Sequence, residues 1–132
     1  MPNLIGKSGV LVHTVMPTDL ATQWKNQLPV LATPILLWLA ELATIKAVEG
    51  ALAPDSMTVG IGHHNRHLAP TPVGFTLRIH ATVVSATAKQ IVFDVEATDG
   101  TDRILEGTHT RAIVDRNSFE TRINHKIAGR QA

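Results

Sequence analysis

Residues 28–45 read LPVLATPILLWLAELATI, the most apolar stretch of this 132-residue chain. Thr33 followed by Pro34 is typical of a helix start, because a side-chain oxygen can cap the first amides and proline fits the first turn. We expect the helix to run to about Leu52 and to stop before Pro54. Its first half is apolar on nearly every side, which predicts that other parts of the protein surround it.

Glu41 is the only charged side chain within this stretch. An ionised carboxylate in dry surroundings is costly, so it pairs, takes up a proton, or belongs to a site that uses it. Active sites are where such placements concentrate. The alternative is a structural carboxylate, bonded to backbone donors or to an arginine across a dimer interface.

Segments of strand character flank the expected helix. One covers residues 9–16, and four follow the helix at residues 57–68, 75–87, 90–98 and 103–114, separated by turn residues. Antiparallel strands joined by short turns can curl about a buried helix. The pattern predicts an α+β hotdog fold, a long central helix wrapped by a five-stranded antiparallel sheet. Because such a sheet has open edges, we expect a homodimer that extends it.

Composition favours one domain over residues 1–132, with a C-terminal tail from about residue 117. The chain has no cysteine, which excludes disulfides, thiolate metal sites and a cysteine nucleophile, and suggests a cytoplasmic location. The first fifteen residues hold neither a charged leader nor a continuous apolar signal core. Two prolines and a carboxylate in residues 28–45 argue against a membrane span.

The net charge of +1 argues against a nucleic-acid binder held by phosphate neutralisation. The charge is unevenly spread, however. Residues 1–110 carry seven Lys/Arg and nine Asp/Glu, whereas residues 111–132 carry five and two, so the net charges are −2 and +3. The basic end is either a solvated tail or a contact for a phosphorylated ligand.

Several motifs together resemble one known family. They are Leu31-Ala32-Thr33 leading into the helix, Glu41 eight residues on, and RHLAPTPVG at residues 66–74. Gly60, seven residues before His67, and GTHTRAIV at residues 107–114 match as well. The chain is similar to the fluoroacetyl-CoA thioesterase family of hotdog proteins from about residue 8 to residue 125.

The resemblance implies a catalytic threonine, glutamate and histidine, here Thr33, Glu41 and His67. It also implies that Gly60 lies at the substrate pocket, and we assign Arg111 of the matched last strand to substrate binding too. The implied activity is hydrolysis of a small or medium acyl-CoA thioester. We expect no metal or redox cofactor, since coenzyme A enters only with the substrate, and no nucleic-acid or membrane partner.

Thioester hydrolysis needs an attacking group, donors for the oxyanion and relief for the departing thiolate. Glu41 can attack the carbonyl to give a mixed anhydride, or it can deprotonate a water. His67 can polarise the carbonyl or shuttle a proton, and Thr33 can orient these groups through its hydroxyl. Eight helical residues span about 12 Å, so substrate, His67 or a second subunit must lie between Thr33 and Glu41.

Two positions depart from the family pattern. Pro34 stands where the fluoroacetyl-specific enzyme has glycine, and its aromatic lid residue falls on Gln27, with Trp24 the nearest aromatic. A polar glutamine does not make the same dry cover over a small fluorinated acyl group. The resemblance therefore favours acyl-CoA thioester hydrolysis over fluoroacetyl specificity.

Each assignment has a structural alternative. Thr33 can be only a helix cap, His67 a satisfied polar residue at a strand end, and Gly60 a bulge. His109 and Arg111 can be cross-strand partners on an exposed face. A metal site at His63 and His67 is disfavoured, because the two would lie about 13 Å apart on a strand. For the whole chain, the alternative function is a non-catalytic hotdog protein that binds an acyl-CoA or a small acid.

Overall fold

The computed structural model describes residues 3–131. It contains five strands, two long helices and two short 3-10 helices, in an α+β arrangement. Their order is β1 (Ser8–Thr14), η1 (Pro17–Asp19), η2 (Ala21–Trp24), α1 (Thr33–Ala47), β2 (Ser56–His67), β3 (Thr76–Ala86), β4 (Gln90–Thr98), β5 (Arg103–Asp115) and α2 (Arg116–Gln131). The predicted order of one strand, a long helix and four strands is confirmed.

α1 ends earlier than the sequence pattern suggested. It begins at Thr33 but stops at Ala47 rather than near Leu52. Gly50 follows with φ +75°, a left-handed conformation that glycine adopts without steric cost and that ends a helix readily. The chain therefore turns back toward the sheet before Pro54 is reached.

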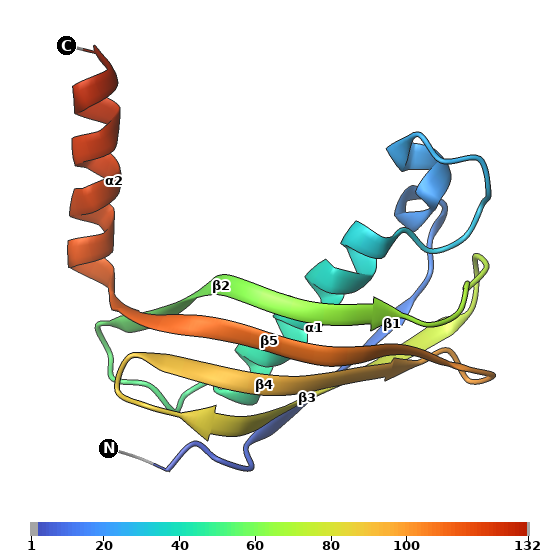
Figure 1. Cartoon of the computed structure of the whole chain (residues 1–132), viewed down its shortest axis with the longest axis horizontal. Helices are drawn as coiled ribbons and strands as arrows, with labels where there is room; N and C mark the ends of the chain where they lie inside the picture. The colour runs from blue at the N-terminus through green and yellow to red at the C-terminus, as the bar shows by residue number, and fades with distance from the viewer. Residues whose placement is uncertain (1–2, 132) are drawn as a thin grey trace.

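The sheet is antiparallel throughout, in the order β1-β3-β4-β5-β2. β1 pairs only with β3 and β2 only with β5, so these two strands are the edges. The register of β2 against β5 shifts between Gly60 and Gly62, which marks a bulge in the edge strand. Figure 1 shows α1 lying along one face of the sheet.

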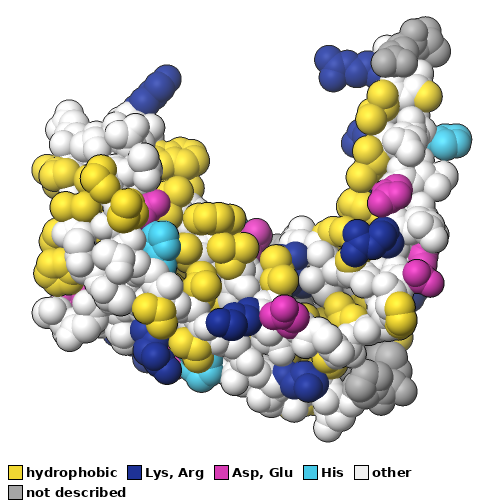
Figure 2. Space-filling model, turned by 180° about the vertical axis from the view of Figure 1, so that it is seen from behind, with side chains coloured by type: hydrophobic (Ala, Val, Ile, Leu, Met, Phe, Trp, Pro, Cys, Tyr) yellow, Lys and Arg dark blue, Asp and Glu magenta, His cyan; other side chains and the backbone are white. Residues whose placement is uncertain are grey.

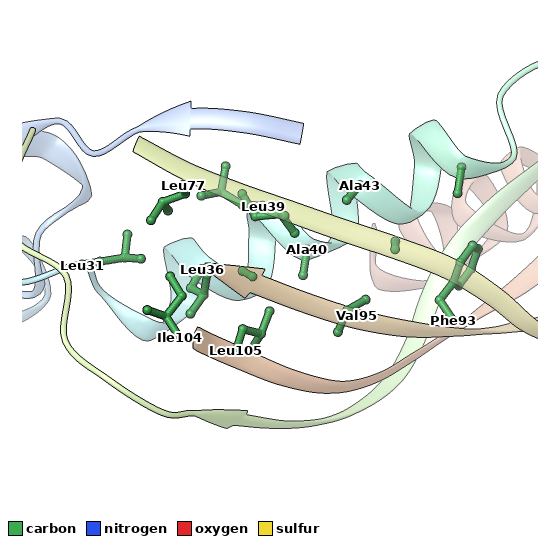
Figure 3. Close-up of a cluster of buried hydrophobic side chains, with 14 of the residues drawn as sticks. Leu31, Leu36, Leu39, Ala40, Ala43, Leu77, Phe93, Val95, Ile104 and Leu105 are labelled. Atoms are coloured by element: carbon green, nitrogen blue, oxygen red, sulfur yellow. The ribbon is translucent and has the colours of Figure 1, made fainter. Parts of the chain in front are cut away.

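The core lies between α1 and the sheet. The buried side of the helix carries Leu36, Leu39, Ala40 and Ala43, which meet side chains such as Leu77 from the strands (Figure 3). α1 packs mainly on β1 and β3. The helix comes close to β1 at Gly9, where an added Cβ would lie 2.6 Å from the Ala47 amide nitrogen. The helix therefore covers one half of the sheet tightly and leaves the half near β2 more open.

One side of α1 is exposed, which corrects the expectation of a helix surrounded on all sides. Trp38 is 49% exposed and Ile45 is 44% exposed. Seven residues span almost two full turns, so both side chains lie on the same side of the helix. Figure 2 shows that hydrophobic side chains line the floor of a broad hollow on the molecule.

The segment predicted to be a tail forms the helix α2. It begins directly after β5 and extends away from the sheet (Figure 1). Within residues 3–131, neither this helix nor any other is both long enough and apolar enough to cross a membrane.

Candidate active site

Thr33 and His67 meet where the start of α1 approaches the end of β2. The Thr33 Oγ1 atom lies 2.7 Å from His67 Nδ1, in hydrogen-bond contact. Ala32 is the residue at the helix cap, and no side chain caps this end of α1. The alternative reading of Thr33 as a cap is therefore wrong, because its hydroxyl is directed to the histidine instead.

His67 is held in its neutral form. Burial lowers the pKa of its imidazole, and a hydrogen bond with the Ala69 backbone opposes the shift only in part. Its Nε2 atom is buried without a hydrogen-bond partner in the described part of the chain. Leaving a buried polar atom unsatisfied costs about 1–3 kcal/mol, so this nitrogen is available to a ligand or a water.

The pair opens into a cavity of about 800 Å³. Its walls come from the segment before α1, from the first turn of α1, and from the chain that leaves β2. They include Gln27, the position onto which the family resemblance places an aromatic lid residue. The lining residues are Ala21, Lys25, Asn26, Gln27, Leu28, Val30, Leu31, Thr33, Pro34, His67, Leu68, Ala69 and Pro70.

Glu41 lies two turns further along α1, beside Gly60 and Arg111. A Cβ added to Gly60 would come within 2.9 Å of Glu41 Oε1 and 3.4 Å of Arg111 Nη1. Both polar groups therefore crowd around Gly60, a strand position that has no side chain. Glu41 is half-buried, and no hydrogen bond to its carboxylate occurs among the described residues. Its oxygens are thus not tied up by backbone or arginine donors.

Arg111 is only 6% exposed, so the alternative of an exposed cross-strand partner is wrong for this residue. Its Nε donates to Thr58 Oγ1 at 2.9 Å and its Nη2 to the Thr58 carbonyl at 3.0 Å. Burial lowers the pKa of Arg111, and the nearby Glu41 carboxylate opposes that shift. Thr58 therefore fixes a buried cation whose remaining charge is directed toward Glu41.

The predicted residues thus form two centres. Thr33 and His67 form one, and Glu41 forms the other with Gly60 and Arg111. Eight residues of helix separate them by about 12 Å along the axis of α1. Helical side chains lean toward the helix N-terminus, so Glu41 reaches back toward Thr33 and the gap between reacting groups is shorter.

A further polar group from β2 and β5 lies between the two centres. The sequence analysis named His63 and His109 separately but did not identify Asn65, which joins them. Asn65 Nδ2 lies 2.9 Å from His63 Nδ1 and 3.1 Å from His109 Nε2. The His63 and His109 rings stack with their centres 5.4 Å apart. His109 is 3% exposed, so the alternative that placed it on an exposed face is also wrong.

The environment keeps His109 neutral. Burial lowers its pKa to about 4, and the charges of His63 and Arg111 add to the effect. The Asn65 amide nitrogen can only donate, so the ring nitrogens that face it act as acceptors. The spacing of His63, Asn65 and His67 at every second position of a strand was the available signal, because such residues share one face.

Among residues 3–131, no three His, Cys, Asp or Glu side chains are placed so that they could hold a metal ion. The chemistry available at the two centres is that of a carboxylate, a neutral imidazole, a hydroxyl and a guanidinium.

The fold and the site define a hotdog-fold thioesterase. The profile of the fluoroacetyl-CoA-specific thioesterase family matches residues 15–117, and the chain belongs to that family. A fluoroacetyl-CoA thioesterase from Streptantibioticus cattleyicolor is 32% identical over 97 residues, which cover 74% of this chain and 70% of that protein. The predicted family resemblance is therefore confirmed.

Solved structures give the same result. A structure of the fluoroacetyl-CoA thioesterase superposes with a TM-score of 0.86 at 26% identity, over 92% of this chain and 96% of that one. A thioesterase superfamily member from Thermus thermophilus superposes with a TM-score of 0.89 at 23% identity, over 99% and 98% of the two chains. The predicted hotdog fold is confirmed.

Proposed function

We propose that this protein hydrolyses a small or medium acyl-CoA thioester, with Thr33, Glu41 and His67 as its catalytic residues and Gly60 and Arg111 as substrate-binding residues. The main support is the pairing of two features. A carboxylate without hydrogen bonds stands beside a buried guanidinium, and a hydroxyl–imidazole pair opens into a cavity. The relative solved with fluoroacetate and CoA bound adds support for a coenzyme A thioester as the substrate class.

Glu41 supplies the attacking group. Its carboxylate either adds to the thioester carbonyl, giving a mixed anhydride that water then opens, or takes a proton from the water that attacks. Gly60 lets the reacting group approach, since any side chain there would meet the carboxylate. Arg111 stabilises the negative charge that develops at this centre through its nearby positive charge.

His67 and Thr33 handle the proton at the other side of the reacting group. Neutral imidazole can take a proton from water and deliver it to the departing thiolate. When His67 Nδ1–H donates to Thr33 Oγ1, this hydrogen bond fixes the orientation of the ring and leaves the free Nε2 atom unprotonated, so Nε2 is the atom that faces the substrate and takes the proton. No metal or redox cofactor has a step in this scheme.

We also propose a homodimer, formed by antiparallel pairing of β2 with β2 of a second copy. β2 is an edge strand, and an unpaired edge is a ready template for another strand. The exposed Trp38 and Ile45 side chains lie on the side of α1 that faces away from the core of the same subunit. A two-fold axis at β2 would bury this surface of both copies and cover the polar group of His63, Asn65 and His109.

The acyl group is expected to differ from fluoroacetyl, because the cavity wall carries Gln27 where the family pattern has an aromatic lid. Glutamine offers hydrogen-bonding groups and does not exclude water as a phenyl ring does. A panel of acyl-CoAs of increasing length and polarity would define the preferred chain.

The decisive experiment replaces Glu41 by glutamine and follows thiol release over that panel. We expect Glu41→Gln to lose turnover by at least about 100-fold, because the amide neither attacks nor accepts a proton. Glu49→Gln is the matched control, since Glu49 is exposed beyond the end of α1. Wild-type turnover in Glu41→Gln would reject the assignment, and saturable CoA binding without any thiol release would favour the non-catalytic binding protein.

A further inference from the structure

α2 carries an apolar stripe that is largely exposed within residues 3–131. Phe119 is half-buried, while Ile123 is 46% exposed and Ile127 is 52% exposed. These residues recur every four positions and so form one row along the helix. A helix of 16 residues is only marginally stable in water by itself, and an amphipathic helix normally buries its apolar row.

The basic residues of α2 lie on the same side as this stripe. At about 100° per residue, every Lys and Arg of the helix falls within about 100° of the centre of the row. They are Arg116, Arg122, Lys126 and Arg130. The opposite side carries the uncharged residues Asn117, Ser118, Thr121 and Ala128, whereas the acidic Glu120 lies on the same side as the basic residues. This is unusual, because a solvated helix places its charges away from its apolar face.

The mixed basic and apolar side of α2 borders the hollow of the molecule. Figure 2 shows hydrophobic side chains along the inner side of the projecting helix, with Lys and Arg side chains among them. Trp38 and Ile45 of α1 also expose apolar side chains. α2 is therefore oriented toward the space that a second copy would occupy.

α2 is anchored at the start of β2. Asp115, the last residue of β5, pairs with Ser56, and the Arg116 amide donates to the Asp55 carbonyl at 2.8 Å. The Thr33–His67 pair lies at the opposite end of β2. Twelve strand residues span about 36 Å, and Figure 1 shows α2 rising away from the sheet rather than along it. The helix does not reach the cavity of its own chain.

Two-fold pairing of β2 changes this relationship. In an antiparallel pair related by two-fold symmetry, the start of one strand lies beside the end of the other. If the two β2 strands pair over their full length, the base of α2 lies next to His67 of the partner subunit. The neighbouring surface there is Leu68 and Pro70, of which Leu68 is 38% exposed, and both residues line the cavity.

We propose that α2 completes the partner subunit's site. Its apolar stripe packs on the rim of the partner's cavity, and Arg122 and Lys126 bind the phosphate groups of coenzyme A at the cavity mouth. This inference rests on the proposed function and on the proposed dimer. It explains why basic and apolar side chains share one face: a second copy takes the apolar row, and an anionic ligand takes the charges. Lys25 in the cavity wall adds a further cation to the same place.

The first test separates coenzyme binding from chemistry. We compare Arg122→Glu/Lys126→Glu with the control Thr121→Glu/Ala128→Glu, which adds two carboxylates on the opposite side of α2. Each protein is assayed with an acyl-CoA and with the N-acetylcysteamine thioester of the same acid, which has no phosphate. We expect the ratio of kcat/KM for the two substrates to fall at least tenfold in the first variant and to stay at the wild-type value in the control. An unchanged ratio in the first variant overturns the inference.

Binding of 3′,5′-ADP, measured by calorimetry, gives a readout that does not depend on hydrolysis. If no thioester is turned over, the proposed enzymatic function fails, but the inference about α2 still predicts at least tenfold weaker binding in Arg122→Glu/Lys126→Glu than in the control. Equal affinities overturn it. Binding of α2 to anionic vesicles with unchanged affinity for 3′,5′-ADP would also overturn it, in favour of a lipid surface.

The second test asks whether α2 acts across the dimer. Mixed dimers of His67→Ala with Arg122→Glu/Lys126→Glu are isolated by two different affinity tags. If α2 serves the partner, one of the two sites combines an intact His67 with an intact α2, and the mixed dimer regains the wild-type KM with about half the wild-type kcat. If α2 serves its own chain, both sites stay defective, and that result overturns the proposal.

Discussion

The Thr33 hydroxyl and the His67 imidazole are in hydrogen-bond contact at 2.7 Å, although 34 positions separate them in the chain. The contact joins the start of α1 to the end of β2, so the fold itself sets the orientation of the ring. Because this hydroxyl does not cap the helix, its removal should affect proton transfer more than folding.

Thr33→Val keeps the shape of the side chain and removes the hydroxyl. We expect thiol release to fall by about 10–100-fold, since an unoriented imidazole loses part of its acid–base effect. The free energy of unfolding should change by less than about 1 kcal/mol, because no cap is lost. Thiol-release kinetics and chemical denaturation measure the two effects. Thr33→Ser should recover most of the turnover, and full activity in Thr33→Val would contradict a positioning role.

Gly60→Ala tests the space in front of Glu41. The new methyl group would lie 2.9 Å from Glu41 Oε1, closer than carbon and oxygen normally approach, so the carboxylate must move. We expect at least a tenfold loss of kcat/KM with a small change in thermal stability. Gly62→Ala is the matched control two residues along the same strand, where an added Cβ meets nothing within 4 Å. Equal activity in the two variants would show that the close approach is irrelevant to catalysis.

Periodicity and turn chemistry were sufficient to predict the five strands and the central helix. Alternating residues in β3 and β4 identify strands, and the apolar run after Thr33 identifies a helix. The end of α1 was missed because Gly50 acts as a local stop before the proline that looked decisive. α2 was missed because its apolar residues are sparse among charged and polar ones. Such a composition is typical of a solvent-exposed tail.

The site was harder to predict than the fold. Motif spacing indicated Thr33, Glu41 and His67, but only coordinates could show that the residues form two centres rather than one. The amide of Asn65 between His63 and His109 depends on the register of β2 against β5, which no single-strand pattern contains. Cross-strand pairing is a long-range property, so it escapes an analysis of local sequence.

The buried His109 should make folding stability depend on pH. Its pKa is about 4 in the folded protein and about 6.5 in an unfolded chain, so the unfolded state binds more protons between these values. The stabilisation that results from this pKa difference is fully present above about pH 6.5 and is lost as the pH falls toward 4. Discounting for solvent screening, we expect stability at pH 5 to be lower than at pH 7 by about 1–2 kcal/mol from this residue.

His109→Gln removes the titrating group while keeping a polar side chain beside Asn65. The free energy of unfolding, measured with urea at pH 7 and at pH 5, should differ less between the two pH values in this variant than in the wild type. The reduction should be about 1–2 kcal/mol. His125→Gln is the control, because His125 lies exposed on α2. The same pH dependence in His109→Gln and wild type would mean that other groups cause it.

Variants of Arg111 and Thr58 separate the effect of the positive charge near Glu41 from the effect of how the guanidinium is positioned. Arg111→Met keeps much of the volume and removes the cation near Glu41, so we expect at least a tenfold loss of kcat/KM in thiol-release assays. Thr58→Val removes only the 2.9 Å bond from Arg111 Nε and leaves the 3.0 Å bond to the Thr58 carbonyl. That variant should lose about 1 kcal/mol of stability and retain most of its turnover, because the guanidinium keeps its charge and one anchor. If Arg111→Met turned over substrate as well as Thr58→Val, the cation would have no role in the reaction and would serve packing alone.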